Sequence, residues 1–213
     1  MIFNSIKRAL VLAPHTDDGE FGCGATIDKL IKSGVEVYYI AFSYCEESVP
    51  EGFAPDVLKH EAKRATKKLG INSENVFVLD YKVRYFSYKR QEILEDLIVY
   101  RRKINPDLIF IPSVNDVHQD HATIANEAIR AFKNRNILSY ELPWNNFKFS
   151  MDLFVEAEES SLDIKIDALK EYESQVAIRG YASEEFIKSL ARVRGTQVGK
   201  DFAEVFEVVR LIN

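Results

Sequence analysis

Short apolar runs that alternate with amphipathic stretches limit the fold of this chain more than any other feature of its sequence. The runs are too short for buried helices and rich in β-branched and aromatic residues, so they predict strands at residues 6–13, 35–42, 75–79, 107–112 and 137–142. The stretches between them predict helices at residues 25–33, 55–69, 88–104 and 122–132. Strands that alternate with helices in this way form a mostly parallel sheet with right-handed crossovers, so we predict an α/β fold with helices on both faces.

The pattern changes after Pro143. Residues 145–155 mix aromatic and polar side chains and predict an extended or edge segment. Two helices are then predicted at residues 162–175 and 184–194, followed by a last strand at residues 203–212. No repeat, low-complexity segment or flexible linker interrupts the 213 residues, so we expect a single domain that spans residues 1–213.

The composition argues against several classes of function. The formal net charge is −5 and no long basic run offsets it, which argues against a nucleic-acid partner. Two cysteines are too few for a disulfide framework and fit a reducing compartment. No apolar run approaches the ~20 residues that a membrane span needs, and the first residues lack a signal-peptide pattern, so we expect a cytoplasmic protein.

Two polar clusters follow predicted strands at the points where those strands end. Residues 15–18 read His-Thr-Asp-Asp after the first strand, and residues 118–121 read His-Gln-Asp-His after the fourth. The carboxyl ends of parallel strands lie at one edge of a sheet, where open α/β folds bind ligands. Three of the four histidines of the chain belong to these clusters, so we expect the clusters to meet and form a metal site.

Such a set of residues suits metal-assisted hydrolysis of an acyl or similar bond. Two imidazoles and one carboxylate are a usual ligand set for a catalytic zinc, which keeps a position open and lowers the pKa of its water to ~7. The carboxylates of Asp17 and Asp18 are adjacent in sequence and diverge, so one can bind metal while the other accepts the proton of the water. A remaining histidine can donate to the oxyanion or to the leaving group.

Two structural interpretations compete with this one. The Asp-Asp-Gly sequence of residues 17–19 is also typical of a turn that caps a helix. The glycines at positions 19, 22 and 24 hint at a dinucleotide loop, but their G-x-x-G-x-G spacing is not the G-x-G-x-x-G of that motif. We therefore expect these glycines to serve tight turning and close helix–strand packing around the metal loop.

Both clusters resemble motifs of a known family. Residues 13–20 (Ala-Pro-His-Thr-Asp-Asp-Gly-Glu) resemble the A-H-P-D-D-E signature of the PIG-L/LmbE-like zinc-dependent de-N-acetylases, and residues 118–121 resemble the second motif of that family, H-x-D-H. Weaker resemblances follow in the same order along the chain, at residues 61–70, 140–144, 172–175 and 194–206.

The resemblance implies a function and a role for each residue of the clusters. It implies a Rossmann-like α/β domain that removes the acetyl group from an N-acetylglucosamine-type conjugate. The zinc ligands that it implies are His15, Asp18 and His121. Asp17 would be the general base, His118 would stabilise the oxyanion or protonate the leaving amine, and Asp120 would orient His118 through a hydrogen bond. Zinc is the expected cofactor, and Fe²⁺ remains an alternative because both metals suit two histidines and one carboxylate.

Three positions depart from the pattern of the family. Thr16 stands where the family has proline, and Gly19 stands where it has glutamate, which follows one place later as Glu20. Leu58 occupies a position that is basic in many members, so a substrate contact is missing or supplied from elsewhere. The candidates for that contact are Lys59 and Arg64, and the further candidates for lining the pocket are Tyr44, Glu46, Arg84, Tyr85 and Trp144.

The expected partner is a small amino-sugar substrate, and two other functions stay open. One is a metal-dependent amidase that acts on a substrate other than a sugar, and the other is a non-catalytic Rossmann-like binding module. The sequence does not identify the group attached to the sugar, and it leaves open whether the chain forms a homo-oligomer.

Overall fold

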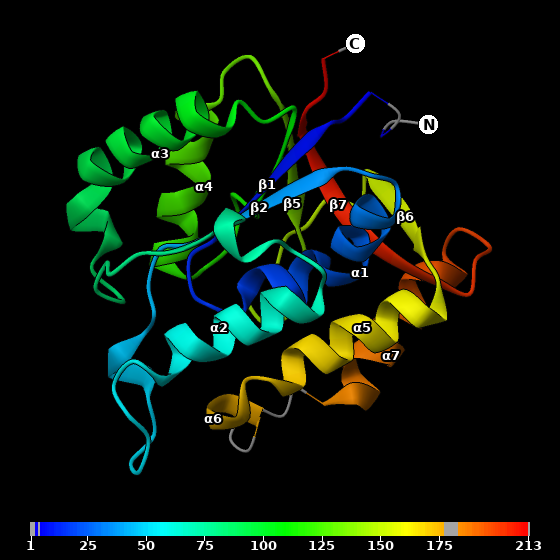
Figure 1. Ribbon diagram of the computed structural model, residues 1–213. Coiled ribbons are helices and arrows are strands. Elements are labelled where there is room, and N and C mark those ends of the chain that lie inside the picture. The colour runs from blue at the N-terminus through cyan, green and yellow to red at the C-terminus, as the bar shows by residue number, and fades with distance from the viewer. Residues whose placement is uncertain (1–2, 4, 177–182, 213) are drawn as a thin grey trace.

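A single mixed sheet organises the part of the chain that the structure describes, residues 3, 5–176 and 183–212 of a computed structural model (Figure 1). Its seven strands are β1 Arg8–Ala13, β2 Glu36–Ala41, β3 Val76–Val78, β4 Leu108–Pro112, β5 Asn136–Tyr140, β6 Leu153–Ala157 and β7 Phe202–Arg210. The strand order is β3-β2-β1-β4-β5-β7-β6, and the first five strands of the chain pair in parallel. This confirms the predicted α/β fold with a mostly parallel sheet.

The order of the strands reverses between β1 and β4. The chain moves from β1 outward to β2 and β3, and then returns to pair β4 with the other side of β1. The loops that leave β1 and β4 therefore diverge at the carboxyl edge of the sheet and leave a crevice between them. Open α/β folds bind ligands at such a switch point. Both predicted polar clusters follow these two strands.

The last strands complete the sheet in the antiparallel direction. β7 pairs antiparallel with β5 on one side and with β6 on the other. The predicted last strand at residues 203–212 matches β7 closely, whereas only the end of the predicted extended segment at residues 145–155 enters the sheet, as β6.

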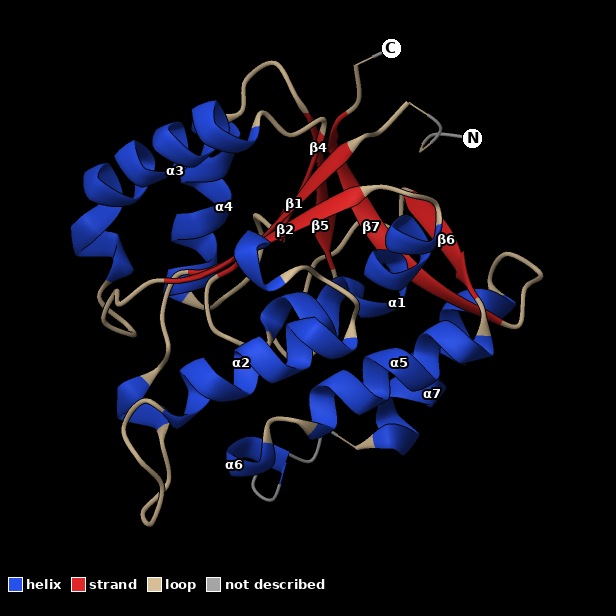
Figure 2. Cartoon of the chain, in the orientation of Figure 1, coloured by secondary structure: helices blue, strands red, loops and turns tan. Residues whose placement is uncertain are grey.

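Helices cover both faces of the sheet (Figure 2). They are α1 Asp18–Lys32, α2 Val57–Lys68, α3 Arg90–Ile104, α4 Gln119–Ala131, α5 Glu159–Lys170, α6 Glu173–Val176 and α7 Glu184–Thr196, with short 3₁₀ turns at Glu46–Ser48, Ser73–Asn75 and Phe86–Lys89. Alternate residues of β1 serve the two faces, because side chains alternate along a strand. Val11 packs in the core beneath α1, α2 and α5, and Leu10 packs in the core beneath α3 and α4. Within the described residues, no helix combines the length and apolar character that crossing a membrane takes.

Helix α1 begins seven residues earlier than the predicted helix at 25–33, and it contains a kink. Cys23 leaves the helical conformation with φ −148° and ψ 23°, which interrupts the ladder of backbone hydrogen bonds. The Nζ of Lys165 binds the carbonyl oxygen of Phe21 at 2.6 Å, and the carboxylate of Glu204 accepts from the N–H groups of Ala25 and Thr26 at 3.1 and 2.7 Å. Two side chains from distant elements thus satisfy backbone groups at the kink.

The glycines of α1 allow close packing against the sheet, as the sequence predicts. A Cβ atom on Gly22 would lie 2.2 Å from Cδ2 of Tyr140, and one on Gly19 would lie 2.6 Å from Cε2 of Tyr39. No larger residue fits at either position without movement of its neighbours. This packing presses the first turn of α1, which carries Asp18, against the carboxyl ends of the strands.

Candidate active site

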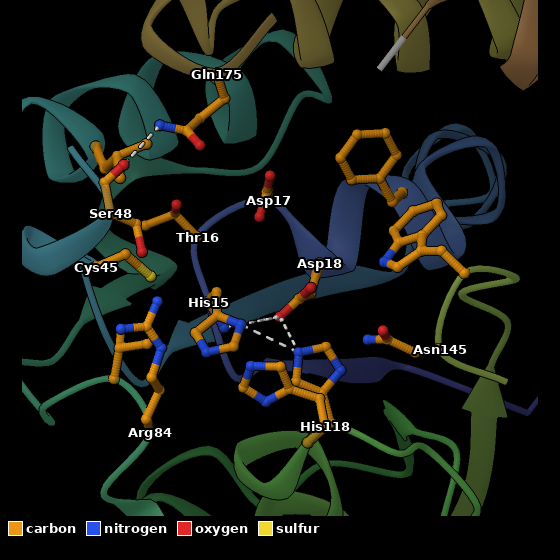
Figure 3. A pocket seen from close by; sticks show the side chains of 15 residues that line it. His15, Thr16, Asp17, Asp18, Cys45, Ser48, Arg84, His118, Asn145 and Gln175 are labelled. Atoms are coloured by element: carbon orange, nitrogen blue, oxygen red, sulfur yellow. Dashed lines mark hydrogen bonds and ion pairs between the residues drawn. The ribbon is translucent and has the colours of Figure 1, made fainter. Parts of the chain in front are cut away.

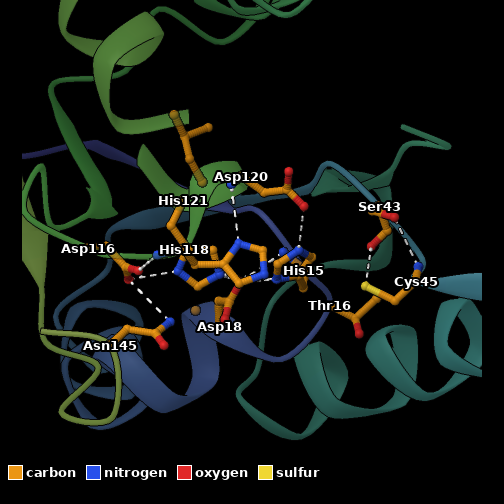
Figure 4. Close-up of polar contacts among 12 residues, drawn as sticks. His15, Thr16, Asp18, Ser43, Cys45, Asp116, His118, Asp120, His121 and Asn145 are labelled. Carbon is orange, nitrogen blue, oxygen red and sulfur yellow. Dashed lines mark hydrogen bonds and ion pairs between the residues drawn. The ribbon is translucent and has the colours of Figure 1, made fainter. Parts of the chain in front are cut away.

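The two polar clusters meet at the crevice between β1 and β4. Residues 15–18 follow β1 and lead into α1, while residues 118–121 cap and open α4. His118 is the N-cap of α4, and its Nδ1 accepts the backbone N–H of Asp120 at 3.2 Å. His121 follows within the first turn of the same helix, so the local helical geometry brings both imidazoles toward His15 (Figure 4).

Three side chains present their metal-binding atoms to one point. Nδ1 of His15 and Nε2 of His121 lie 3.1 Å apart, and Oδ2 of Asp18 lies 3.3 Å from each of them. A tetrahedral metal with ligands at 2.0–2.1 Å places neighbouring ligand atoms about 3.3 Å apart. The spacing of His15, Asp18 and His121 therefore fits a metal of this size.

Carboxylates behind the two imidazoles fix which nitrogen of each ring faces the crevice. Nε2 of His15 lies 3.2 Å from Oδ2 of Asp120, and Nδ1 of His121 lies 2.8 Å from Oδ2 of Asp116. Each outer ring nitrogen then donates its proton to a carboxylate, which leaves the inner nitrogen as an acceptor. Two imidazole acceptors and one carboxylate facing one another require a cation among them.

A proton serves as that cation in the metal-free chain. Burial lowers the pKa of His121, but the charge of Asp18 and the hydrogen bonds with Asp116 and Asp18 outweigh burial and raise this pKa to about 10. Burial likewise opposes the ionisation of Asp18, yet the neighbouring imidazoles hold its pKa well below the usual range. Because ligands bind metal in their deprotonated form, metal and proton compete for this position.

His118 forms a second set of three with the same two histidines. One ring nitrogen from each of His15, His118 and His121 lies within 4.8 Å of the others, so this group could also hold a metal. The ring of His118 lies edge-on to that of His15, with the centroids 4.9 Å apart. Burial and the neighbouring positive imidazoles lower the pKa of His118 to about 4. Asp18 makes the tighter set because its oxygen lies 3.3 Å from both imidazole nitrogens.

A cavity of about 210 Å³ opens above these side chains (Figure 3). Asp17 lines it and is 7% exposed, and its carboxylate lies on the side of His15 and Asp18 away from His118. The adjacent carboxylates of Asp17 and Asp18 thus diverge, one toward the cavity and one toward the imidazoles. The described residues that line the cavity are His15, Thr16, Asp17, Asp18, Phe21, Cys45, Ser48, Leu58, Val83, Arg84, His118, His121, Trp144, Asn145 and Gln175.

Asp120 contacts two histidines of the site. The expected hydrogen bond between Asp120 and His118 is present, and the backbone N–H of Asp120 donates it to Nδ1 of His118 at 3.2 Å. The carboxylate of Asp120 lies 3.2 Å from Nε2 of His15 and accepts the N–H groups of Arg84 and Phe86 at 2.6 and 3.3 Å. The contact of this carboxylate with His15 is not among the sequence expectations.

Asp116 is a site residue that the sequence interpretation missed. Besides its contact with His121, it accepts the backbone N–H of His118 at 2.8 Å, and its side chain is fully buried. Asp116 stands two residues before His118, in the loop that follows β4. This position is the sequence signal that could have identified it as a site residue.

The residues at positions 16, 19 and 20, where the chain departs from the family motif, take part in contacts beneath the loop. Glu20 is fully buried and accepts hydrogen bonds from the hydroxyl groups of Tyr39 and Tyr172. The same hydroxyls contact the carbonyl oxygen of Thr16, at 3.0 Å for Tyr39 and 2.5 Å for Tyr172. Glu20 therefore supports the loop from below and lies outside the set of residues that line the cavity. Gly19 leaves the room that the ring of Tyr39 occupies.

The candidate substrate contacts divide into two groups. Arg84 and Trp144 line the cavity, as does Leu58, and Tyr85 borders a shallower hollow beside it. The other candidates, Tyr44, Glu46, Lys59 and Arg64, are not among the residues that line the cavity. Tyr44 bonds to Glu46 at 3.2 Å, and Arg64 pairs with Glu171 at 2.9 Å. Neither predicted substitute for the basic residue at position 58 reaches the cavity.

The weaker family resemblances also meet in space. Glu61 of α2 accepts both the N–H and the hydroxyl of Ser174, at 3.0 and 2.6 Å, and Arg194 pairs with Glu141. These contacts join helices of the second half of the chain to the strands and helices around the cavity.

Comparison with known proteins agrees with the geometry. Residues 10–132 match the family model of PIG-L, GlcNAc-PI de-N-acetylase, which covers more than half of the chain. The chain belongs to the PIG-L family. A relative in this comparison is the diacetylchitobiose deacetylase of Thermococcus kodakarensis, which is 25% identical over 95% of this chain and 83% of its own length.

Solved structures show the same fold. The N,N'-diacetylchitobiose deacetylase of Pyrococcus horikoshii, solved with its inhibitor MPG, superposes with a TM-score of 0.82 at 21% identity and covers 98% of this chain and 85% of its own. GalB, the 4-carboxy-2-hydroxymuconate hydratase of Pseudomonas putida, superposes with a TM-score of 0.77 at 18% identity over 97% of this chain and 98% of its own. Because the fold also houses a hydratase, the reaction must be argued from the site.

Proposed function

We propose that this chain is a metal-dependent hydrolase that removes the N-acetyl group from an N-acetylglucosamine-type conjugate. The observation that carries the proposal is the convergence of Nδ1 of His15, Oδ2 of Asp18 and Nε2 of His121 at 3.1–3.3 Å, at the floor of a cavity. The family match and the deacetylases among its relatives support the choice of an acetyl amide as the bond that is cut.

His15, Asp18 and His121 would hold the metal, and zinc is the proposed ion because a set of two imidazoles and one carboxylate is typical of catalytic zinc. When bound, the metal supplies Lewis acidity that polarises the amide carbonyl and brings the pKa of a water close to 7. Asp116 and Asp120 keep the two imidazoles in the tautomers that this role needs.

Asp17 acts as the general base. Its carboxylate lines the cavity and diverges from that of Asp18, so it can accept a proton from the water that attacks the amide carbon. The nearly complete burial of Asp17 limits competition from bulk water.

His118 acts on the opposite side of the metal ligands. Its Nδ1 accepts the N–H of Asp120, so the other nitrogen of the ring carries the proton and faces the crevice as a donor. In that place the N–H of His118 donates a hydrogen bond to the charge that develops on the carbonyl oxygen. To protonate the leaving nitrogen, His118 would first have to take up the proton that Asp17 accepts from the water, so that the ring ends neutral. The products are acetate and the free amino sugar.

The test combines metal analysis with an activity assay on protein purified without added metal or chelator. We expect about one zinc per chain and release of acetate from N-acetylglucosamine conjugates. His121→Ala should lower the metal content, and Asp17→Asn should keep the metal while kcat falls by about 10²- to 10⁴-fold. A chain that takes up no metal refutes the proposal, and a zinc-loaded chain that releases acetate only from other amides refutes the sugar substrate.

A further inference from the structure

Arg84 occupies a backbone conformation that arginine rarely adopts. The N–H of Tyr85 bonds to the carbonyl oxygen of Lys82 at 3.1 Å and closes a turn, in which Arg84 is the third residue with φ +70°. Turns with a positive φ at this position favour glycine, because a side chain there is strained. Strained residues that persist in a structure are concentrated at functional sites, so the side chain of Arg84 calls for a functional reason.

The turn is tied directly to the metal-binding residues. Oδ2 of Asp120 accepts the N–H of Arg84 at 2.6 Å and also lies 3.2 Å from Nε2 of His15. The other carboxylate oxygen accepts the N–H of Phe86, whose side chain is fully buried. One carboxylate thus holds the backbone of Arg84 at a fixed distance from the candidate metal centre.

The side chain of Arg84 lines the cavity and has no salt-bridge partner among the residues that the structure describes. Figure 3 shows it on the wall beside His15, on the same side as Thr16 and Cys45. Of the described residues that line the cavity, Arg84 is the one arginine or lysine. Leu58, which lines the same cavity and is 2% exposed, brings no charge to it.

A shallower hollow continues from the cavity past Arg84. Val83 and Arg84 line both spaces, and the other residues that line the hollow are Glu47, Lys82, Tyr85 and Tyr88. A group attached to the acetylated sugar can leave the cavity along this route. It then passes the guanidinium of Arg84 and the ammonium of Lys82, which lies 3.6 Å from Glu47.

We propose that Arg84 binds an anionic group, a carboxylate or a phosphate, on the part of the substrate attached to the acetylated sugar, and so selects acidic conjugates. This inference rests on the proposed deacetylase function. The planar guanidinium matches the oxygens of a carboxylate or phosphate through paired hydrogen bonds, which neutral sugar hydroxyls replace poorly.

The experiment compares an N-acetylglucosamine glycoside whose attached group ends in a carboxylate with the same compound as its neutral amide, and a third glycoside that ends in a phosphate. For the natural chain we expect kcat/KM to be higher for an acidic compound than for the amide. Arg84→Gln should reduce that preference about tenfold, mainly through KM, because a charge-assisted hydrogen bond is lost. The carboxylate and phosphate compounds show which anion is the better fit. Arg102→Gln removes the same charge from an exposed site on α3 and should leave the preference intact.

A second variant separates binding from structure. Arg84→Gly relieves the left-handed strain, so its midpoint of thermal unfolding should rise while its preference for the acidic compounds is lost. A structural role for the arginine side chain predicts a fall in that midpoint instead. The proposal is overturned if Arg84→Gln keeps the acid-to-amide ratio of the natural chain.

Failure of the deacetylase proposal would be seen separately, as absence of acetate from all three glycosides with the natural chain. In that case, calorimetric titration of the same glycosides into the natural chain and Arg84→Gln decides the binding proposal. Loss of the acid-to-amide affinity ratio in Arg84→Gln supports an anion site, and an equal ratio in both proteins overturns it.

Discussion

The buried ion pair at the kink of α1 makes a demanding prediction about stability. Lys165 and Glu204 lie 2.7 Å apart, with side chains only 7% and 5% exposed, and together they satisfy three backbone groups of α1. Lys165→Met leaves the carboxylate of Glu204 buried without its cation and leaves the carbonyl of Phe21 without its donor. Removal of one member of a buried pair costs about 3–5 kcal/mol of the free energy of unfolding.

That cost converts into a large shift in Tm. With an unfolding entropy of about 2.1 cal/mol/K per residue, a chain of 213 residues loses about 2 °C of Tm per kcal/mol. We therefore expect Lys165→Met to lower Tm by about 7–11 °C in calorimetry or circular dichroism. Lys188→Met is the matched control, because Lys188 pairs with Glu184 at 2.9 Å on the surface, and it should leave Tm close to that of the natural chain.

The double variant Lys165→Met/Glu204→Gln tests the reason for the loss. Glutamine leaves no buried charge without a partner, and it can still accept one backbone N–H. The double variant should therefore lose less stability than the sum of the losses of the two single variants. Additive losses, or a loss below about 1 kcal/mol for Lys165→Met, would refute the argument that these side chains stabilise the kink as a pair.

Three further changes test other parts of the structure. Gly22→Ala brings a Cβ atom to 2.2 Å from the ring of Tyr140, so urea unfolding should show a loss of about 2–3 kcal/mol. Burial raises the pKa of Glu20 to about 8 despite its tyrosine hydrogen bonds, so the folded chain keeps a proton that the unfolded chain releases above pH 4.5. The free energy of unfolding should therefore fall as the pH rises from 4.5 to about 8, by up to about 1.4 kcal/mol per pH unit. Glu20→Gln should flatten this dependence on pH. Asp116→Asn weakens the support of His121 and should lower zinc affinity about 10- to 100-fold in a competition titration with a chelator.

Each of these three has a clear contrary result. If Gly22→Ala has the same free energy of unfolding as the natural chain, Tyr140 can move aside. Parallel pH curves for Glu20→Gln and the natural chain would mean that the carboxyl does not titrate differently on unfolding. Equal zinc affinity in Asp116→Asn would mean that the orientation of the imidazole does not depend on this carboxylate.

The sequence predicts the parallel part of the fold well because the strands are short apolar runs with regular spacing. The prediction fails at the start of α1, where three glycines within six residues hide the helical pattern. Glu204 and Lys165 satisfy backbone groups at the kink that follows, and their hydrogen bonds span 144–179 residues. Local pattern cannot reveal such partners. The segment before β6 is harder still, because only the pairing with β7 decides where the strand begins.

The candidate site, like the fold, can be predicted from the sequence only in part. The residue types and the alternation of strands and helices predict that the two clusters meet. The family resemblance then implies the set His15, Asp18 and His121, whose side chains lie together in the structure. The carboxylates that support the imidazoles cannot be predicted, because the capping of α4 decides which carboxylate faces which imidazole. The contact of Asp116 with His121 and that of the Asp120 carboxylate with His15 are therefore absent from the sequence interpretation. The place of Arg84 on the cavity wall likewise depends on the path of a loop that no periodicity describes.

The position of β7 has a consequence for how the protein matures during synthesis. β7 inserts between β5 and β6 and supplies Glu204 to a helix whose N–H groups precede it by 178 and 179 residues. Closing loops of this length is slow and entropically costly, so such contacts form late. During synthesis, the N–H groups of Ala25 and Thr26 therefore stay without this acceptor until β7 has emerged from the ribosome.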